Sequence, residues 1–416
     1  MIYLDNNATT RPSPAVVEAV CRALTDLWPN PSSMHRAGQA ARQAVELARR
    51  EVATLIGARA REITFTSSGT ESIDLAIRGA LEASERRTII TTRVEHGAVR
   101  ELAHDLEQRG LAAVRWAPLD RHGAADPDAI AELLDGSVAL VSVQWANNET
   151  GVVHPVARIG ALCRERGVLF HCDGTQWVGK MPTNVGSAPP LSRTDPATNS
   201  HARCTTGDQT PAVEATPIDI LTFSPHKFHG PKGIGVVWTR RGVRLRPQIH
   251  GTQELGRRGG TENVPGIVGA GVACREAAEW LADPENLRTC RDRRDRFERM
   301  VAQRVPGAVI NGPRSPEARV WNTASIGFPR LEAEALLLLM SERGLCASAG
   351  SACASGSLEA SPVLIASGIA PEVAHGTIRF STCRHTTDDE IDRAVGLIAE
   401  CVEVLSRSMA ASGRGE

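Results

Sequence analysis

The strongest constraint on the fold is an alternation of short apolar segments with amphipathic segments over the first two-thirds of the chain. The apolar segments are rich in Val, Ile and Thr and are typical of buried strands. Between them, segments such as 71–84, 97–110 and 156–167 repeat apolar residues three or four positions apart, as amphipathic helices do. This order predicts a mostly parallel sheet with helices on both faces. The expected strands are Glu62–Ser67, Arg87–Thr92, Val138–Trp145, Gly167–Asp173, Ile218–Ser224 and Gly233–Trp238.

A different pattern begins at about Glu262, where longer helical stretches alternate with a few strand-like ones. Within it, the charged run RDRRDRFER is interpreted as a solvated helix face with opposite charges three or four positions apart. This part of the chain is expected to form a second, α+β domain. Helices are expected at 263–282, 286–305, 331–344 and from Asp388 to about Met409.

Charge and hydropathy argue against several classes of protein. Lys and Arg number 47 against 48 Asp and Glu, so direct binding to nucleic acid through bulk charge is not expected. No apolar run approaches the roughly 20 residues of a membrane span, and the opening MIYLDNNATT has no pattern of a signal peptide. Ten cysteines are scattered without C-x-x-C pairs. We therefore expect a cytoplasmic protein with reduced thiols and no membrane partner.

Residues 183–215 stand apart because they are rich in Pro, Ser, Thr and Gly. Such a composition buries little apolar surface, so we expect a long loop between a helix and a strand. The loop contains His201 and Cys204, but one Cys and one His make a poor metal site. We therefore predict no metal, and interpret the loop as a tolerated surface insertion rather than a docking element for a partner.

The motif SPHKFHGPKGIG, residues 224–235, follows an expected strand and puts Lys227 at its end. Most lysines in such a place are ordinary surface side chains beside a turn. A lysine at a strand end among polar groups is also where Schiff-base lysines occur. Lys227 alone does not decide between the two interpretations.

Two other strand ends carry groups that suit a pyridine cofactor with a phosphate. Asp173 ends one strand, where a carboxylate could keep a pyridinium nitrogen protonated, and Gln176 follows three residues later. Gly69 and Thr70 open a helix after another strand, and a helix N-terminus is a natural cradle for phosphate.

Two more strand ends add a ring and two amides. His96, in RVEHGAV, offers a flat ring that could stack on a flat cofactor, and WANNETG offers Asn147 and Asn148. Each of these groups alone would be an ordinary helix cap, core histidine or turn asparagine. Together, at the strand ends of one parallel sheet, they favour a pyridoxal-phosphate site.

These motifs resemble those of class V aminotransferase-fold enzymes, and specifically the cysteine desulfurases of the nitrogen-fixation and iron–sulfur-cluster type. The matching motifs run nearly end to end: YLDNNATT, NPSSMHRAG, TSSGTES, VEH, NNETGV, D-x-x-Q-x-x-GK, SPHKFHGPKGIG, RRGGTEN, SAGSAC and IRFSTCR-x-TT. The resemblance implies pyridoxal-phosphate fold type I, an α/β fold with a large domain whose mostly parallel seven-stranded sheet is flanked by helices. That domain would span 13–261, with the insertion at about 183–215, and a smaller α+β domain would combine 1–12 and 262–416.

The resemblance also implies how each site residue would hold pyridoxal 5'-phosphate. Lys227 would be the Schiff-base lysine, and His96 would stack on the ring and assist proton transfer. Asp173 would pair with the pyridine nitrogen and Gln176 with the ring hydroxyl. The remaining cofactor contacts are assigned to Gly69, Thr70, Asn148, Ser224 and His226, with Thr261 reaching in from the partner subunit of a homodimer.

The substrate implied by the resemblance is L-cysteine, held by Asn148 and by Arg379, whose guanidinium would bind its carboxylate. Cys353, in SAGSACASGS, would be the catalytic nucleophile. Its thiolate would take the substrate sulfur as a persulfide, release L-alanine and pass the sulfur to an acceptor protein. The small residues around Cys353 offer little to pack, which suits a segment that carries sulfur outward.

The chain departs from the family pattern at a few positions. Gly174 stands where members commonly have Ala, which would remove a methyl group from the contact surface of the ring. HGTQE, residues 250–254, is one residue shorter than the family's HGGGQE. Cys346 and Cys383 are interpreted as packing residues. A selenocysteine lyase and a non-catalytic sulfur-transfer scaffold stay open as alternatives, as does the destination of the sulfur: iron–sulfur cluster assembly, tRNA thiolation or DNA phosphorothioation.

Overall fold

The computed structural model describes residues 1–186, 214–349 and 360–412 of the chain. Its centre is a seven-stranded sheet with the strand order β2-β8-β7-β6-β5-β3-β4. β8 is antiparallel to both of its neighbours, and the other neighbouring pairs are parallel. The predicted α/β class and mostly parallel sheet are therefore confirmed. The strands are β2 (Ile63–Thr66), β3 (Thr88–Thr92), β4 (Ala113–Ala117), β5 (Val138–Ser142), β6 (Leu169–Asp173), β7 (Ile220–Phe223) and β8 (Gly235–Thr239).

The strand that the sequence analysis missed is β4. It lies at the edge of the sheet, paired only with β3, and its first four residues are exposed or half-buried. Its sequence AVRWA includes an arginine. An edge strand covered on fewer sides does not need a continuous apolar run, so the pattern that revealed the central strands is absent there.

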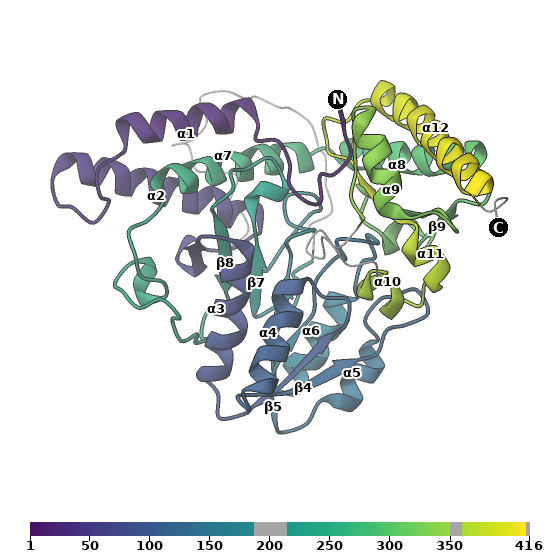
Figure 1. Ribbon diagram of the computed structural model, residues 1–416. Helices are drawn as coiled ribbons and strands as arrows, with labels where there is room; N and C mark the ends of the chain where they lie inside the picture. Colours follow the sequence, from purple (N-terminus) through teal and green to yellow (C-terminus); the bar gives the residue numbers. More distant parts are fainter. Residues whose placement is uncertain (187–213, 350–359, 413–416) are drawn as a thin grey trace, which may run out of the picture.

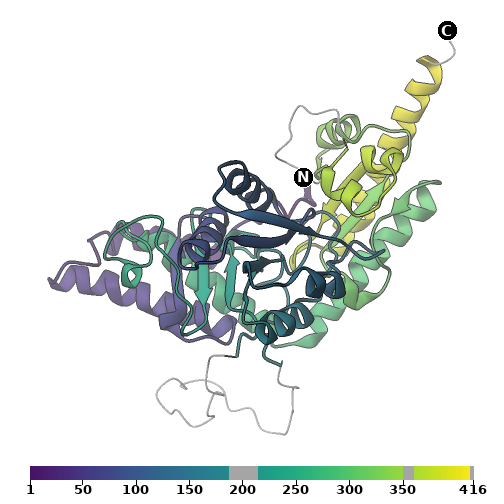
Figure 2. The same cartoon turned by 90° about the horizontal axis from the view of Figure 1, so that it is seen from below.

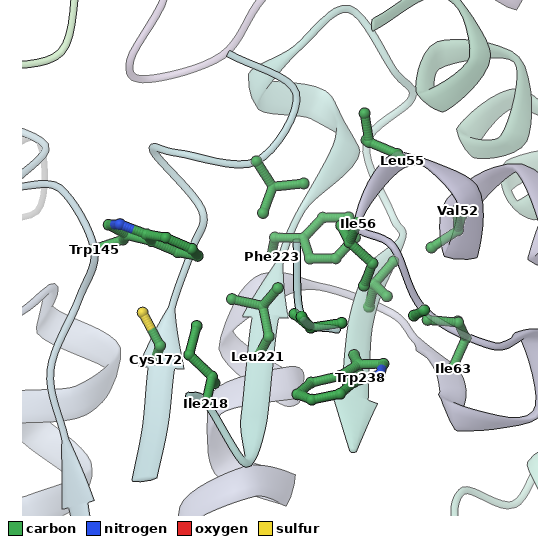
Figure 3. Packing of buried hydrophobic residues seen from close by; sticks show 14 of the residues in the cluster. Val52, Leu55, Ile56, Ile63, Trp145, Cys172, Ile218, Leu221, Phe223 and Trp238 are labelled. Atoms are coloured by element: carbon green, nitrogen blue, oxygen red, sulfur yellow. The ribbon is translucent and has the colours of Figure 1, made fainter. Parts of the chain in front are cut away.

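Helices cover both faces of the sheet, as Figures 1 and 2 show. On one face, α3 (Gly69–Glu82) and α4 (Gly97–Gln108) contribute to a buried cluster. Figure 3 shows Leu221 and Trp238 of the sheet, and Ile56 just after α2, within the cluster on the other face. The helices that contribute to this second face are α1 (Pro14–Asp26), α2 (Arg36–Leu55), α5 (Pro127–Leu133), α6 (Val156–Glu165) and α7 (Val264–Leu281).

A separate hydrophobic cluster forms around a three-stranded antiparallel sheet with the order β12-β10-β9. It contains Ile2 and Leu4 from the start of the chain and Ile398 from the last helix, so the first strand and the last helix share one core (Figure 1). The residue limits of the two domains stay a prediction. The elements are β1 (Ile2–Tyr3), α8 (Pro284–Arg304), β9 (Val309–Ile310), β10 (Thr323–Gly327), α9 (Ala333–Glu342), β11 (Leu345–Cys346), α10 (Pro362–Ala366), α11 (Pro371–His375), β12 (Thr377–Ser381) and α12 (Asp388–Ser412).

The expectation that RDRRDRFER is a solvated face of α8 is wrong in part. Arg294 is only 1% exposed, and its Nη1 donates to the main-chain oxygen of Val320 at 2.7 Å. Phe297 is buried in the small-sheet cluster, and Glu298 pairs with Arg319 at 2.7 Å. The charged run therefore includes residues on the buried face of α8. An arginine can lie on such a face once its N–H groups have acceptors.

The two ends of the expected insertion lie side by side, since the amide of Thr216 donates to the carbonyl of Asn184 at 2.9 Å. Residues 187–213, with His201 and Cys204, lie outside the described residues. None of the helices in the described ranges has both the length and the hydropathy needed to cross a bilayer. The described residues also contain four short 3-10 helices: η1 (Ala60–Glu62), η2 (Pro225–Lys227), η3 (Glu254–Gly256) and η4 (Pro316–Ala318).

Candidate active site

One edge of the central sheet gathers the segments that carry the predicted site. β2, β3, β5, β6 and β7 run in the same direction, so their carboxyl ends meet at this edge. The turns that follow these strands enclose a cavity of about 180 Å³. Its lining contains all the predicted cofactor residues except Thr261. The lining residues are Ser68, Gly69, Thr70, Ile73, His96, Gln144, Ala146, Asn148, Asp173, Thr175, Gln176, Ser224, His226 and Lys227.

The N-terminus of α3 forms one wall of this cavity. Ser68 is its N-cap, and its Oγ accepts a hydrogen bond from the amide of Glu71 at 3.1 Å. The amides of Gly69 and Thr70 belong to the first turn, where N–H groups have no intrahelical acceptor. A Cβ on Gly235 would lie 2.1 Å from the carbonyl oxygen of Ser68, so only glycine lets β8 pass this close to the turn. The wall therefore offers backbone donors and the positive end of a helix dipole to an anion.

His96 lines the cavity as the N-cap of α4. Its Nδ1 accepts a hydrogen bond from the amide of Ala98 at 3.1 Å, which puts the proton of the neutral ring on Nε2. Desolvation lowers the pKa of His96, opposed by the charge of Asp173 and assisted by that of Lys227. The imidazole is consequently neutral at pH 7 and able to take up a proton.

Glu95 lies behind His96 and is completely buried. Its carboxyl oxygens accept hydrogen bonds from the Thr92 hydroxyl at 2.8 Å and the Gln144 amide at 2.9 Å. Desolvation raises the pKa of Glu95 to about 8, and the negative charge of Asp173 acts in the same direction. A protonated, uncharged Glu95 is therefore the main form at pH 7.

Asp173 and Gln176 come from the end of β6 and the turn that follows. Asp173 is buried, and its Oδ1 accepts a hydrogen bond from the amide of Thr175 at 3.0 Å. Gln176 is held on both sides of its amide: Nε2 donates to Asn7 O at 3.0 Å, and Oε1 accepts from Lys180 Nζ at 2.6 Å. A carboxylate and a fixed amide thus meet in one part of the cavity.

Lys227 ends the 3-10 turn after β7, and the start of the chain holds its amine. Nζ donates to the main-chain oxygens of Asn7 at 2.7 Å and Ala8 at 2.8 Å. Next to it, His226 Nδ1 lies 3.1 Å from the Thr9 hydroxyl. Desolvation, with the charge of Lys227, lowers the pKa of His226 to about 4, so this ring is neutral.

Arg379, in β12, lies beside the cavity rather than in its lining. Its Nη1 donates to the main-chain oxygen of Asn148 at 3.1 Å, and its Nη2 pairs with Asp5 at 2.7 Å. The two residues predicted to hold the substrate are thus in contact. Asp5, which the sequence analysis did not select, already engages part of the guanidinium.

Thr261 is the predicted cofactor residue that is absent from the lining of this cavity. Thr261 lines a different pocket, together with Arg258 and residues at the end of β2. Cys353 lies outside the described residues. On the N-terminal side of the segment that carries it, Ser348 pairs with the backbone of Arg379.

The segment on the other side of Cys353 is also anchored at the site. The Ser361 hydroxyl donates to Glu149 Oε2 at 2.6 Å, and Glu149 directly follows Asn148 in the chain. Asn147, in contrast, is a turn asparagine: its Oδ1 accepts hydrogen bonds from the amides of Glu149 and Thr150.

The sequence analysis missed Asn7 and Lys180, both of which are buried behind the cavity. Their motifs, YLDNNATT and D-x-x-Q-x-x-GK, carry no chemical signal beyond the resemblance. The one local hint was the spacing of four residues between Gln176 and Lys180. The contacts of Asn7 could not be anticipated, because its partners lie more than 140 residues away in the chain.

A family model described as Aminotransferase class-V matches residues 2–188 and 204–394. The chain belongs to the class-V aminotransferase family. A curated relative, a cysteine desulfurase of Nostoc sp. strain PCC 7120, is 46% identical over 407 residues, which is 97% of this chain and 94% of the relative. A solved structure of a NifS-like protein has a TM-score of 0.83 at 34% identity, covering 97% of this chain and 100% of its own. Another, described as SspA in complex with cysteine, has a TM-score of 0.75 at 29% identity, covering 93% and 100%.

Membership of the class-V aminotransferases implies pyridoxal phosphate, and the lining fits that group. The α3 N-terminus and the Thr70 hydroxyl suit a phosphate, Asp173 suits a pyridinium nitrogen, and Lys227 supplies an amine. A Cβ on Gly69 would stand 3.5 Å from the Ser224 side chain, in the space between the two walls. Glycine at this position keeps the phosphate end of the cavity open.

The expectation that Gly174 removes a methyl group from the contact surface of the ring is wrong. A Cβ at this position would lie 2.8 Å from Leu221 Cδ1 and 3.0 Å from Val178 Cγ2. Both of those side chains belong to the buried cluster under the sheet. A methyl group at position 174 would therefore point into the core and not into the cavity.

Proposed function

We propose that this class-V aminotransferase is a pyridoxal-phosphate-dependent cysteine desulfurase. It would remove sulfur from L-cysteine, release L-alanine and retain the sulfur as a persulfide on Cys353. The observation that carries the proposal is the cavity in which Lys227, Asp173 and His96 face one another at the strand ends. The relatives of the same family point in the same direction: one is a cysteine desulfurase, and one was solved with cysteine.

The lining residues would divide the binding of the cofactor between them. When bound, pyridoxal phosphate supplies an electron sink for negative charge that develops at the substrate Cα. Lys227 would hold it covalently, and Asp173 would keep its ring nitrogen protonated. Gly69, Thr70, Ser224 and His226 would bind the phosphate through N–H and O–H donors, completed by Thr261 from the second subunit of a homodimer.

His96 and Arg379 would act on the substrate. Because His96 is neutral at pH 7, its imidazole can accept a proton from the substrate and return it. Arg379 and Asn148 would hold the substrate, with Arg379 binding the cysteine carboxylate. Since Asp5 and the main-chain oxygen of Asn148 already engage the guanidinium, the carboxylate would have to share or displace these contacts.

The sulfur transfer needs one thiolate. The Cys353 sulfur would form a bond with the substrate sulfur, and the Cβ–S bond of the substrate would break with its electron pair left on carbon. Protonation of that carbon gives the methyl group of alanine, and the enzyme keeps the S–S pair. Buried thiols elsewhere are poor nucleophiles: burial raises the pKa of Cys163 to about 12 and of Cys290 to about 11.

The persulfide would then pass to an acceptor protein, in the cytoplasm and without direct contact with nucleic acid. The near balance of 47 basic and 48 acidic residues supports a protein acceptor over a nucleic acid. Iron–sulfur cluster assembly, tRNA thiolation and DNA phosphorothioation are all compatible destinations.

A comparison of three proteins loaded with pyridoxal phosphate tests this function: the wild type, Cys353→Ser and Lys227→Ala. The wild type should convert cysteine to alanine and carry a persulfide. Cys353→Ser should keep the cofactor's visible absorbance but form no persulfide, and Lys227→Ala should lose turnover by more than about 10³-fold. Persulfide formation at the wild-type rate in Cys353→Ser would refute the mechanism. A wild type active on selenocysteine but inert on cysteine would make the protein a selenocysteine lyase.

A further inference from the structure

Lys180 is a buried amine directly behind the cavity. Its side chain is enclosed between Gln176 and Asn7: Nζ lies 2.6 Å from Gln176 Oε1 and 3.1 Å from Asn7 Oδ1. Desolvation lowers the pKa of Lys180 well below its ordinary value, and the charges of Lys227 and Arg379 lower it further. Burying an amine this deeply costs free energy. An amine that is kept in this place with two specific hydrogen bonds is expected to do more than fill space.

Those contacts decide which way round the Gln176 amide lies. Lys180 offers N–H donors to Oε1 whether the amine is charged or neutral, and the main-chain oxygen of Asn7 can only accept, which requires Nε2 on its side. A flipped amide would set its oxygen against the carbonyl of Asn7. Since Nε2 has two hydrogens and Asn7 uses one, the second is left for the cavity that Gln176 lines.

Asn7 is itself unable to turn, because its side chain uses its full hydrogen-bonding capacity. Oδ1 accepts from Lys180 Nζ and Asn322 Nδ2, and Nδ2 donates to Asn148 O and Thr323 Oγ1. The amide of Asn7 also donates to the Ser381 hydroxyl at 2.9 Å. We call this set the Asn7 network: Asn7, Lys180, Asn322, Thr323 and Ser381. It ties Lys180 to Thr323 at the start of β10, to Asn322 just before it and to Ser381 in β12. These contacts hold the amine in one position.

We propose that Lys180 is a positioning residue that locks the Gln176 amide with its nitrogen toward the cavity. This role rests on the proposed function, in which Gln176 meets the ring oxygen of the cofactor. An N–H donor stabilises negative charge on that oxygen, whereas a carbonyl oxygen in the same place would repel it. Lys180 thus sets the electronic state of the site without touching the cofactor.

The test is a pH titration of the visible absorbance of bound pyridoxal phosphate in four holoproteins: wild type, Gln176→Leu, Lys180→Met and the double variant. Without the N–H donor, negative charge on the ring oxygen is stabilised less, so the bound cofactor keeps its titrating proton to higher pH. Gln176→Leu should therefore raise the titration midpoint by about one pH unit, a tenfold change in proton affinity. Lys180→Met should shift it in the same direction, by no more than Gln176→Leu does, because Asn7 still attracts Nε2. The double variant should shift no further than Gln176→Leu alone, because both changes act on one interaction.

Two control variants separate positioning from general damage. Trp321→Phe removes a donor to the main-chain oxygen of Lys180 but leaves Nζ in place, so its midpoint should equal that of the wild type even if it unfolds more easily. Lys180→Gln keeps a donor and should stay close to the wild-type midpoint. Lys180→Leu is the replacement for Lys180→Met if that variant does not fold.

The outcomes distinguish this role from the function on which it rests. A wild-type midpoint in Lys180→Met, or a double variant shifted twice as far, would overturn the positioning role while Gln176→Leu still shifts. An equal shift in Trp321→Phe would overturn it as well. A wild-type protein that binds no pyridoxal phosphate would overturn the proposed function and this role together.

Discussion

The cavity lining and the Asn7 network meet at Gln176 and Lys227, yet they are built in different ways. The lining comes from five turns that follow strands of one sheet, and several of its side chains are open to solvent. The Asn7 network joins the start of the chain to β10 and β12, and its side chains are at most 4% exposed. The lining presents chemical groups to a ligand, whereas the network fixes where those groups stand.

The difference shows why hydrogen-bond saturation matters more behind the cavity than in it. Lining groups such as Thr70 and the α3 amides need free capacity, because a ligand supplies their partners. A buried group in the network has no water to replace a lost partner, so each missing bond leaves a costly orphan. Substitutions in the lining should therefore lower activity with little change in stability. Substitutions in the Asn7 network should lower the free energy of unfolding and displace the groups of the lining.

The largest effect that would sharpen this contrast is expected for Asn7→Leu. The substitution removes one hydrogen-bond partner each from Lys180, Asn322 and Thr323. Losing several buried hydrogen bonds at once should lower the free energy of unfolding by about 3 kcal/mol or more, and turnover should fall as well. Denaturant unfolding of the apoprotein measures the first, with the exposed Arg11→Ala as control. A loss of activity with unchanged stability would place Asn7 with the lining instead.

A second test uses Glu95, a buried carboxyl behind the lining. Because its folded-state pKa of about 8 lies above its ordinary value of 4.5, the folded state binds the proton more tightly than the unfolded state. The stability from this group is full below about pH 4.5 and is lost as the pH rises toward 8. The side chain of Glu95→Gln does not titrate in this range. The free energy of unfolding of this variant should therefore fall less steeply with pH than that of the wild type, by up to about 1.4 kcal/mol per pH unit.

The measurement for Glu95→Gln is the free energy of unfolding between pH 5 and pH 8. Glu101→Gln, on the exposed side of α4, is the matched control and should keep the wild-type slope. If the free energy of unfolding of Glu95→Gln fell as steeply with pH as that of the wild type, the Glu95 carboxyl would be charged in the folded protein. The region behind His96 would then be open to water.

The smallest effect is expected for Gly174→Ala. The added methyl group points at Leu221 and Val178, whose flexible ends must move by a few tenths of an ångström. We expect a change of about 1 kcal/mol in stability and an unchanged affinity for pyridoxal phosphate, measured by absorbance titration. A clear change in cofactor affinity would mean that this position does face the ring.

Much of the lining could be predicted from sequence, and the reason is local. A strand in a parallel sheet is a short apolar run, its end is marked by the first polar residues, and parallel strands end at one edge. Asp173, His96 and Lys227 could be placed together on that basis. Edge strand β4 and the buried Arg294 escaped because their burial depends on what packs against them, which no local pattern reveals.

The sequence by itself determined the α/β class, the polar groups at the ends of the strands and, through its resemblance to cysteine desulfurases, the candidate cofactor and substrate residues. Only the tertiary structure decided that Asn7 holds Lys227, Lys180 and Gln176 in one network, that Asp5 engages Arg379, and that Gly174 faces the core. The physical reason is that strand ends are specified by neighbours in the chain. A hydrogen bond between residues hundreds of positions apart is specified by how two cores pack, and that information is spread over the whole sequence.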